Sequence, residues 1–294
     1  MRMKVIGYLQ LLRIPAIFTV ISNILAAHFI ATQDNSIQWG NLFLLIVISV
    51  AIYLSGMVLN DCYDFDEDSI YSPHRPLPAG HIELNNAWRL GWGLMLMGLL
   101  LAFYAGVTQF TVTLVLALLV ILYNGYLKQT VIAPLLMGSC RYFNWILGFS
   151  FVPFKQEAFI FALPIFFYIS ALTYLSTEEA TIVKNRSPLV VCVIGMILCL
   201  LLLLSFLIPG PVSTANTSIA ILISLFILNV AYVLWQTNRD YSSQQIQKAV
   251  KTLIMGVIPL DALIVLTQVS YWQAFIILLL LIPGWFLSQR LRVT

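Results

Sequence analysis

Charge is scarce in this sequence. Asp, Glu, Lys and Arg make up 9% of the 294 residues, whereas hydrophobic residues make up 61%. Soluble domains usually contain about 25% charged residues, so this composition cannot cover an ordinary water-exposed surface. The formal net charge is only +3, and no long basic run offers a nucleic-acid site. Composition therefore argues against a soluble protein and against a nucleic-acid partner, and it indicates a protein surrounded by lipid.

Cysteine is also sparse, and its spacing excludes two further classes of protein. The sequence contains four cysteines and no CxxC pair: Cys62, Cys140, Cys192 and Cys199. Most of them lie inside or beside apolar runs, where cysteine acts as a small packing residue. We therefore expect neither a structural disulfide nor a cysteine metal site.

Long hydrophobic runs account for most of the chain. A membrane-spanning helix needs about 20 predominantly apolar residues. Ten segments meet this requirement: 11–31, 41–60, 86–107, 109–127, 131–153, 157–177, 188–209, 217–236, 249–268 and 271–288. Because they leave no room for a separate soluble domain, we expect one transmembrane domain over residues 1–294.

The basic residues between these segments predict the orientation in the membrane. Lys and Arg accumulate in cytoplasmic loops, and here they avoid every odd-numbered connection except at Lys155. The even-numbered connections and the two ends collect nearly all the others: Arg2, Lys4, Arg75, Arg89, Lys128, Lys184, Arg186, Arg239, Lys248, Lys251, Arg290 and Arg292. This alternation predicts ten spans, with both termini and the charged motifs on the cytoplasmic side.

An acidic cluster follows the second span. The segment NDCYDFDED (60–68) contains five of the twelve acidic residues of the chain. On a continuing helix, Asn60, Asp64 and Asp68 would share one face, with Asp61 close to both aspartates. Carboxylates so close together repel one another, and a divalent cation such as Mg²⁺, which prefers oxygen ligands, would relieve this repulsion. The other two acidic residues point elsewhere and are expected to be solvated: Asp66 and Glu67. The alternative is a merely polar loop, which the regular spacing disfavours.

These residues resemble a known family. The pattern Asn60-Asp61-x-x-Asp64-x-x-x-Asp68 is similar to the first aspartate-rich motif of the UbiA superfamily of intramembrane prenyltransferases. Further similarities to that family lie in RPLPAG (75–80), in YNGYLK (123–128) and in an arginine that opens the first span, Arg13. The resemblance extends over residues 1–190, and the tail, with IPLDA at 258–262, resembles the EboC-like branch.

The resemblance implies both a fold and an activity. The fold would be all-α and polytopic, a bundle of nine to ten transmembrane helices around a central lipid-accessible cavity. The activity would be the magnesium-dependent transfer of a prenyl group from an allylic isoprenyl diphosphate to an acceptor, often an aromatic one. The expected cofactor is Mg²⁺, and the expected partners are the isoprenyl diphosphate donor, an unidentified acceptor and membrane lipid.

Specific residues follow from the resemblance together with charge. The metal would be held by Asn60, Asp61, Asp64 and Asp68, with Glu178 and Glu179 as candidates for a second ion. The diphosphate would be bound by basic side chains: Arg13, Arg75, Lys128, Arg141, Lys184 and Arg186. The catalytic candidates are Tyr123, Lys128 and Arg141. Tyr123 would hydrogen-bond the diphosphate or face the allylic cation with its ring.

Two charged residues stand inside apolar segments. Arg141 lies 13 residues beyond Lys128, roughly 15–20 Å deeper at the rise of a helix. A charge within the membrane is costly and indicates a function, although a structural ion pair is the alternative. Asp261 is the second such residue. For it, a role in packing or in linking helices and a role in catalysis both stay open.

Three departures from the family pattern keep other functions open. The segment STEEATIVKNR (176–186) has Glu178 and Glu179 where the family has a second aspartate motif, and Ser72 replaces a frequent arginine. The family also usually has nine spans rather than ten. A family member that binds isoprenoid lipid without catalysis is therefore one alternative. A transporter is another, although its charged site would be expected near the midplane of the membrane.

Overall fold

The computed structural model describes residues 2–33, 36–153, 156–179, 184–207 and 214–290, and within these ranges the regular structure is helical. Seventeen helical elements follow one another along the chain: α1 (Arg2–Leu11), the 3₁₀ turn η1 (Ile14–Ala16), α2 (Ile17–Ala31), α3 (Trp39–Tyr63), α4 (Phe65–Tyr71), α5 (Leu84–Ala105), α6 (Val107–Leu122), the π-helical segment η2 (Tyr123–Leu127), α7 (Ala133–Phe149), α8 (Gln156–Phe161), α9 (Leu163–Ser176), α10 (Ser187–Ser205), α11 (Thr214–Arg239), α12 (Ser243–Met255), α13 (Val257–Gln268), α14 (Tyr271–Leu279) and α15 (Leu281–Arg290).

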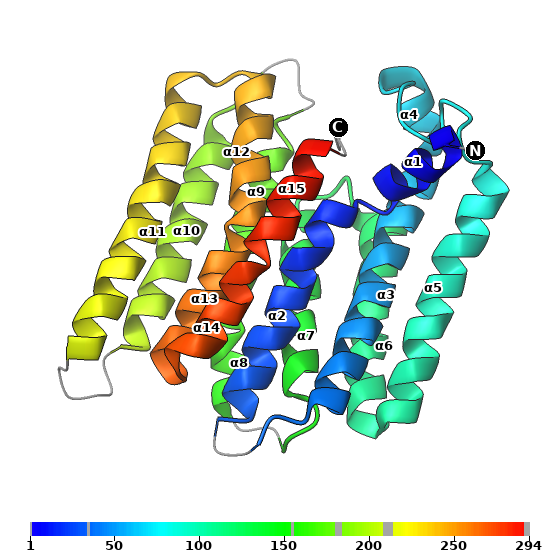
Figure 1. Cartoon of the computed structure of the whole chain (residues 1–294). Helices are drawn as coiled ribbons and strands as arrows, with labels where there is room; N and C mark the ends of the chain where they lie inside the picture. Colours follow the sequence, from blue (N-terminus) through cyan, green and yellow to red (C-terminus); the bar gives the residue numbers. More distant parts are fainter. Residues whose placement is uncertain (1, 34–35, 154–155, 180–183, 208–213, 291–294) are drawn as a thin grey trace.

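The long helices run up and down side by side in one bundle (Figure 1). Helix α2 lies in the interior, where it packs against α3, α7 and α13, while α5 and α11 lie at opposite edges. The short helices α1 and α4 lie at one end of the bundle, and the last turn of α15 ends there too (Figure 1). This end, which also carries the end of α3, is called the motif end below.

The number of spans matches the expectation of nine to ten. Within the described residues, nine helices are long and apolar enough to cross a membrane. The predicted segment 131–153 forms the shorter α7, whose 17 residues extend about 25 Å, and α7 is not among these nine. Because α1 and α15 approach the same end of the bundle (Figure 1), the chain crosses it an even number of times, and α7 supplies the tenth crossing. The last two residues of the predicted span 188–209 lie outside the described residues.

Several predicted spans are interrupted rather than straight. The first is broken before Ile17, the sixth between α8 and α9, the ninth between α12 and α13, and the tenth between α14 and α15. Proline, which has no backbone N–H to donate, lies within a few residues of each break. Backbone groups freed in a membrane need other partners, and the Tyr168 hydroxyl donates to the Leu253 carbonyl oxygen near the end of α12, at 2.8 Å.

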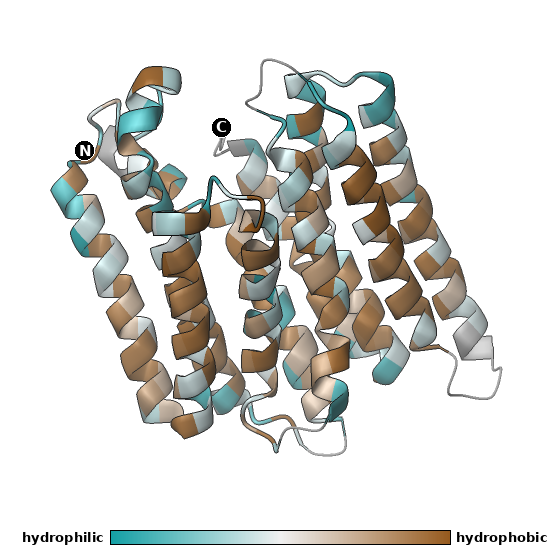
Figure 2. Cartoon of the chain, turned by 180° about the vertical axis from the view of Figure 1, so that it is seen from behind, coloured by the Kyte–Doolittle hydropathy of each residue, from teal (hydrophilic) through white to brown (hydrophobic). Residues whose placement is uncertain are grey.

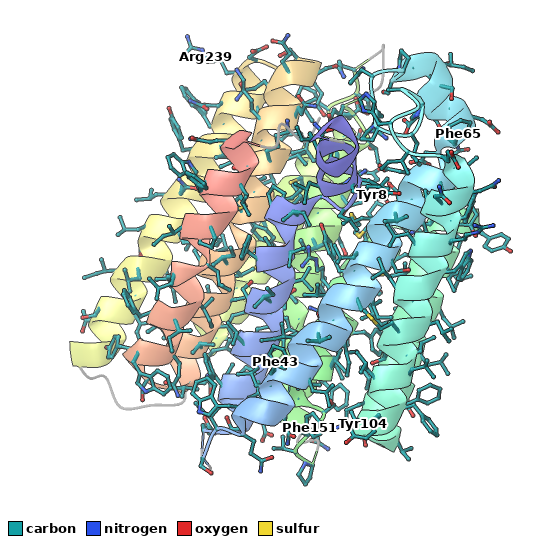
Figure 3. All side chains as sticks on the ribbon, turned by 45° about the vertical axis from the view of Figure 1, so that its right-hand side comes forward. Tyr8, Phe43, Phe65, Tyr104, Phe151 and Arg239 are labelled. Atoms are coloured by element: carbon teal, nitrogen blue, oxygen red, sulfur yellow. The ribbon has the colours of Figure 1, made fainter. Side chains whose placement is uncertain are left out.

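The outer surface of the bundle is apolar along its middle and more polar at its ends (Figure 2). Large side chains such as Leu201, Leu225 and Phe103 are exposed there, as expected for a surface that contacts lipid tails. Tyr8 and Phe65 lie toward the motif end, whereas Phe43, Tyr104 and Phe151 lie toward the opposite end (Figure 3). Aromatic rings at both ends are typical of the two membrane interfaces.

Small residues allow the central helices to approach closely. A side chain at Gly148 of α7 would place its Cβ 2.5 Å from the Cβ of Ala27 on α2, and one at Gly138 would collide with Ser170 on α9. Close approach at small residues is the usual way in which helices pack within a membrane. These contacts hold α7 in the interior, where its polar side chains meet those of α2.

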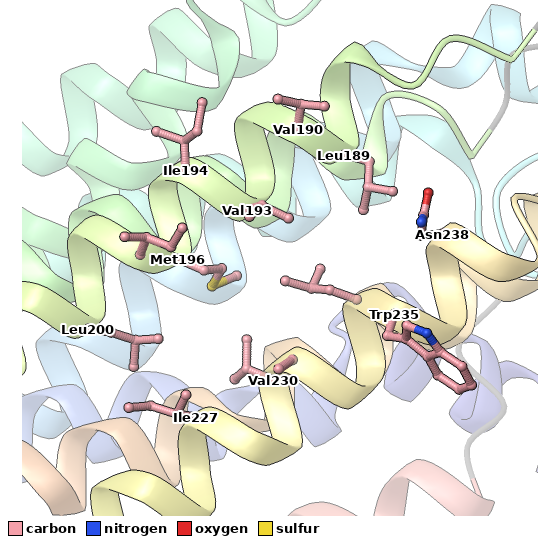
Figure 4. Close-up of a pocket in the computed structure, with 13 residues that line it drawn as sticks. Leu189, Val190, Val193, Ile194, Met196, Leu200, Ile227, Val230, Trp235 and Asn238 are labelled. Atoms are coloured by element: carbon pink, nitrogen blue, oxygen red, sulfur yellow. The ribbon is translucent and has the colours of Figure 1, made fainter.

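An apolar groove of about 570 Å³ lies between α10 and α11. Its walls are lined by side chains such as Val193, Met196, Ile227 and Val230, and Trp235 and Asn238 lie toward one end (Figure 4). Helices α10 and α11 are on the opposite side of the bundle from α3 and α5 (Figure 1). This groove is therefore separate from the acidic motif, and the central cavity expected from the sequence stays a prediction.

Candidate active site

The acidic motif lies where α3 passes into α4. The helix bends at Asp64, but its backbone N–H still bonds the Asn60 carbonyl oxygen at 3.0 Å, and the Asp68 N–H bonds the Asp64 carbonyl oxygen at 2.8 Å. The i, i+4 spacing predicted from the sequence is therefore kept through the bend. Asp66 and Glu67 are exposed whereas Asp68 is buried, which confirms that these two acidic residues point away from the cluster.

Three of the four aspartates in the motif, Asp61, Asp64 and Asp68, each pair with one basic side chain. Arg13 Nη2 lies 2.9 Å from Asp61 Oδ1, Arg75 Nη1 lies 2.6 Å from Asp68 Oδ2, and Lys128 Nζ donates to Asp64 Oδ2. The aspartate side chains expose 7, 10 and 14% of their surface respectively, while the basic partners expose about a third of theirs, 30, 27 and 32%. Since burying an unpaired charge is costly, these partners stabilise the acidic cluster.

Arg13 reaches the motif through an unusual backbone conformation. It is the one residue other than glycine with positive φ in the part of the chain that the structure describes, at φ 46° and ψ 47°. This left-handed conformation costs roughly 1–2 kcal/mol for a residue with a Cβ. Such strain persists only where the surrounding structure enforces it, often at functional sites. The turn separates α1 from η1 and directs the guanidinium group toward α3, where it also contacts Asn60 Oδ1 at 3.5 Å.

The RPLPAG segment folds back to place Arg75. A compact turn joins the Ala79 N–H to the Arg75 carbonyl oxygen at 2.9 Å, and Gly80 closes the segment at φ 71°. Leu77 is buried in a small apolar cluster with Leu11 and Val58. This anchor under the turn holds the guanidinium group of Arg75 against Asp68.

The YNGYLK segment adopts a π-helix rather than continuing α6. π-Helical turns are rare and frequently mark functional sites. The Asn124 side chain donates to the Gly56 carbonyl oxygen at 3.0 Å and accepts from Asn60 Nδ2 at 3.1 Å. Asn124 thereby fixes the segment to α3, and Lys128, four residues further on, meets Asp64. Tyr123 lies close enough that the charges of Asp64 and Arg13 act on its hydroxyl.

The loop after α9 forms a separate polar cluster. Glu178 Oε2 accepts the Asn185 N–H at 3.0 Å, and Glu179 Oε1 accepts from Gln247 Nε2 of α12 at 2.8 Å. Burial and the nearby Glu178 carboxylate raise the pKa of Tyr241, so its hydroxyl stays protonated and donates to the Asn185 carbonyl oxygen at 2.9 Å.

The two basic residues of this loop are engaged within the same region. Lys184 donates to the Glu178 carbonyl oxygen, and Arg186 Nη1 lies 3.3 Å from Asn238 Oδ1. No ion pair joins either residue to the aspartate motif among the described side chains. The roles assigned to this loop from sequence, as second metal ligands and diphosphate contacts, stay predictions.

Arg141 occupies a different setting from the other basic candidates. It lies in the middle of α7, where Nη2 bonds Thr19 Oγ1 at 3.0 Å and Nη1 bonds Asn23 Oδ1 at 3.3 Å. Its guanidinium carbon also lies 5.7 Å from the centre of the Tyr53 ring on α3. The structural alternative, a direct ion pair, is not formed within the described residues. Asp261 lies nearby, fully buried, and joins α13 to α2 and α7 through Ser22, Asn23 and Trp145.

The carboxylate oxygens of the aspartate motif are suitable ligands for Mg²⁺. In the described parts of the chain, however, no group of three or more His, Cys, Asp or Glu side chains is assembled for metal binding. In each ion pair one carboxylate oxygen is used, and within the same residues no side-chain or backbone donor bonds the other. Mg²⁺ takes oxygen ligands and commonly binds one or two carboxylates together with substrate phosphates. The free oxygens of Asp61, Asp64 and Asp68 could supply such ligands.

Comparison with known proteins agrees with this arrangement. The model of the UbiA prenyltransferase family matches residues 20–255, which contain the aspartate motif, RPLPAG, YNGYLK and Arg141. The chain belongs to the UbiA prenyltransferase family. This family member is similar to digeranylgeranylglyceryl phosphate synthases of Metallosphaera sedula, with 33% identity over 102 residues, and of Sulfurisphaera tokodaii, with 29% identity over 127 residues. The alignments cover 35 and 43% of this chain, and 36 and 45% of those proteins.

Solved structures share the fold over most of its length. A UbiA homolog from Archaeoglobus fulgidus bound to GPP and Mg²⁺ aligns with 87% of this chain and 99% of its own, with a TM-score of 0.62 and 15% identity. A digeranylgeranylglyceryl phosphate synthase structure aligns with 90% of this chain and 99% of its own, with a TM-score of 0.67 and 20% identity. These likenesses confirm an all-α, multi-pass integral membrane protein.

Some residues of the site gave only a weak signal in the sequence. Asn124 lies within YNGYLK, but nothing in that motif indicates that its amide bridges Asn60 and Gly56. Asn23 and Tyr53 are single polar residues in long apolar runs, and their contacts with Arg141 depend on how α2, α3 and α7 pack. The signal in the sequence that could have indicated these two residues was a polar side chain in the middle of a span.

Proposed function

We propose that this UbiA family member transfers a prenyl group from an allylic isoprenyl diphosphate to an acceptor within the membrane, in a reaction that depends on Mg²⁺. One observation carries the proposal. Three carboxylates and three basic groups, brought together from four segments of the chain, form paired charges at one end of an apolar bundle. The donor has the same two-part character, because its charged diphosphate is joined to a hydrocarbon chain.

The paired charges suit the binding of a metal–diphosphate complex. Without substrate, three negative and three positive side chains neutralise one another. When the diphosphate binds, Arg13, Arg75 and Lys128 can donate charge-assisted hydrogen bonds to its oxygens, and such bonds are strong. The carboxylates of Asp61, Asp64 and Asp68 would then be available to hold Mg²⁺, which would neutralise charge on the diphosphate.

The reaction needs stabilisation of the leaving group. The bond between the first prenyl carbon and the diphosphate oxygen breaks, and the electron pair departs with the diphosphate. An electron-rich carbon or oxygen of the acceptor forms the new bond to that prenyl carbon and then loses its proton. Positive groups placed where the negative charge develops lower the barrier, a role we assign to Lys128 and Arg13. The charges of Asp64 and Arg13 both act on the Tyr123 hydroxyl.

The acceptor is proposed only as a class. The curated relatives are named for a glyceryl phosphate product, while the wider resemblance favours aromatic acceptors. We also propose that the motif end faces the cytoplasm, because the basic connections gather there.

The proposal can be tested on purified protein, in detergent for turnover and reconstituted in sealed vesicles for transport. Diphosphate release from geranyl, farnesyl and geranylgeranyl diphosphates would be measured with Mg²⁺ and with EDTA, in the presence of a lipid and small-molecule extract. We expect release that requires Mg²⁺, with a prenylated product visible by mass spectrometry. Binding of a donor without any release would favour a lipid-binding protein. Movement of substrate across sealed vesicles without consumption of the donor would favour a transporter.

A further inference from the structure

Arg141 is a membrane-embedded cation that the structure holds with neutral partners. A guanidinium group has five N–H donors, and the hydrogen bonds of Arg141 within the described residues go to one hydroxyl and one amide oxygen. Its other contact is the face of the Tyr53 ring. A cation in the middle of a membrane span usually has a partner. The partial exposure of Arg141 shows that part of its surface is not covered by protein.

Asp261 sets the orientation of one of these neutral partners, the Asn23 amide. Its Oδ2 accepts from Asn23 Nδ2 at 2.7 Å, and an ionised carboxylate can only accept. The Asn23 amide must therefore turn its N–H toward Asp261 and its oxygen toward Arg141. Thr19 is fixed in the same sense, because its hydroxyl donates to the Ala16 carbonyl oxygen at 2.7 Å and leaves its oxygen free to accept from Arg141.

This arrangement keeps the negative charge close to Arg141 but out of contact. Asn23 bridges the Asp261 carboxylate and the guanidinium group. Asp261 therefore forms no direct ion pair with Arg141 and does not occupy the guanidinium N–H groups that another carboxylate could bind. The site is held from α2, α7 and α13 together. A rigid cation with unused N–H groups is suited to a planar or tetrahedral oxyanion.

The site is also set apart from the groups that pair with the aspartate motif. Tyr53, which the guanidinium group of Arg141 faces, lies seven residues before Asn60 on α3, roughly 10 Å along the helix. The charges of both Arg13 and Arg141 act on the Tyr53 hydroxyl. Tyr53 is therefore near both Arg141, whose guanidinium carbon lies 5.7 Å from its ring, and Arg13, which pairs with the motif.

We propose that Arg141 binds an oxyanion, a carboxylate or a phosphate, carried by the acceptor rather than the diphosphate of the donor. The inference rests on the proposed prenyl transfer and adds the chemical class of the second substrate. Asp261 and Asn23 act as positioning residues for this contact.

The experiment separates acceptors by charge before their identity is known. A small-molecule and lipid extract would be divided by anion exchange into water-soluble acids, phosphate-bearing lipids and neutral compounds. Each fraction would be assayed with radiolabelled geranylgeranyl diphosphate and Mg²⁺, with wild-type protein, Arg141→Gln and Arg141→Lys. We expect product from an acidic fraction. In Arg141→Gln the KM for that acceptor should rise roughly 10- to 100-fold, since hydrogen bonds to charged groups contribute more than neutral ones, while the donor KM stays unchanged. Arg141→Lys should recover part of the loss.

The outcomes are distinct. Product from the water-soluble acids or from the phosphate lipids would support the proposal and identify the source of the oxyanion. Product from the neutral fraction alone, no product from any fraction, or a change in donor KM instead of acceptor KM in Arg141→Gln would overturn it. Mg²⁺-dependent diphosphate release would be measured separately. If it is present, a negative result rejects only this inference; if it is absent, the proposed function itself fails. A melting temperature near that of the wild type would show that Arg141→Gln is folded.

Discussion

Lys128 donates a hydrogen bond to Asp64 from 64 residues further along the chain. The contact joins the end of the π-helical segment to the bend between α3 and α4, and therefore ties the YNGYLK motif to the aspartate motif. It belongs to a set of three such pairs. Because each aspartate meets a basic residue from a different segment, the site depends on the packing of α1, α3, α4 and η2 around it.

Asp64→Asn should abolish most turnover while Asp66→Asn should not. Both changes remove one negative charge from the same short stretch, but Asp64 meets Lys128 whereas Asp66 is exposed. We expect Mg²⁺-dependent diphosphate release to fall about 100-fold or more in Asp64→Asn, the scale on which loss of one electrostatic group slows an enzyme. Release would be followed with a coupled diphosphate assay. Equal rates in the two variants would remove Asp64 from the site.

Arg13→Gly and Arg13→Ala should differ in stability although they lose the same ion pair. Glycine accepts the left-handed conformation at this position, φ 46°, without the cost that a Cβ brings. Arg13→Gly should therefore be about 1 kcal/mol more stable than Arg13→Ala. Both should bind donor diphosphate more weakly than the wild type. Thermal unfolding in detergent measures the first effect, and donor KM the second. Identical melting temperatures would show that the turn relaxes when Arg13 is replaced.

Asn124→Ala should weaken both the fold and donor binding. The change leaves the Gly56 carbonyl oxygen and the Asn60 amide without their partner at a buried position, which costs about 1–3 kcal/mol. It also loosens the segment that places Lys128, so the KM for the donor should rise. Asn85→Ala, at an exposed position in the first turn of α5, is the matched control and should stay within about 0.5 kcal/mol of the wild type. A rise in donor KM without loss of stability would contradict the bridging role.

Asp261→Asn should change the acceptor KM more than the donor KM. An amide at this position can turn its own N–H group toward Asn23, so the bond from Asn23 Nδ2 is lost or weakened and the Asn23 amide is held against Arg141 by the guanidinium group alone. The acceptor KM should rise about tenfold, as for the loss of one hydrogen bond to a charged group, with kcat little changed at saturating acceptor. Ser22→Ala removes a neighbouring bond to the same carboxylate oxygen but leaves the Asn23 bridge. A similar effect from both variants would indicate general damage to packing instead of loss of the bridge.

Much of the architecture could be predicted because it depends on local properties. Each apolar run is long enough to require a helix in lipid, and the even number of crossings follows from the alternation of basic loops. The breaks at Arg13 and Gly256 were not predicted, although a proline lies within a few residues of each. The metal ligands could be selected from the spacing of Asn60, Asp64 and Asp68. Their present partners could not, because charge complementarity does not specify which arginine or lysine reaches which carboxylate.

By itself, the sequence determined that this protein lies in lipid, that its fold is helical and that it carries the acidic motif, since each of these depends on composition or on spacing within one helix. The tertiary structure decided which cations meet Asp61, Asp64 and Asp68, that Glu178 and Glu179 belong to a separate loop cluster, and that Arg141 lies with Asn23 and Tyr53. Several of these relationships join distant residues, such as Asn23 and Arg141, which are 118 positions apart, although Asp68 and Arg75 are only seven apart. They are settled by the close packing of helices, where side chains on neighbouring helices meet only in one relative rotation and depth.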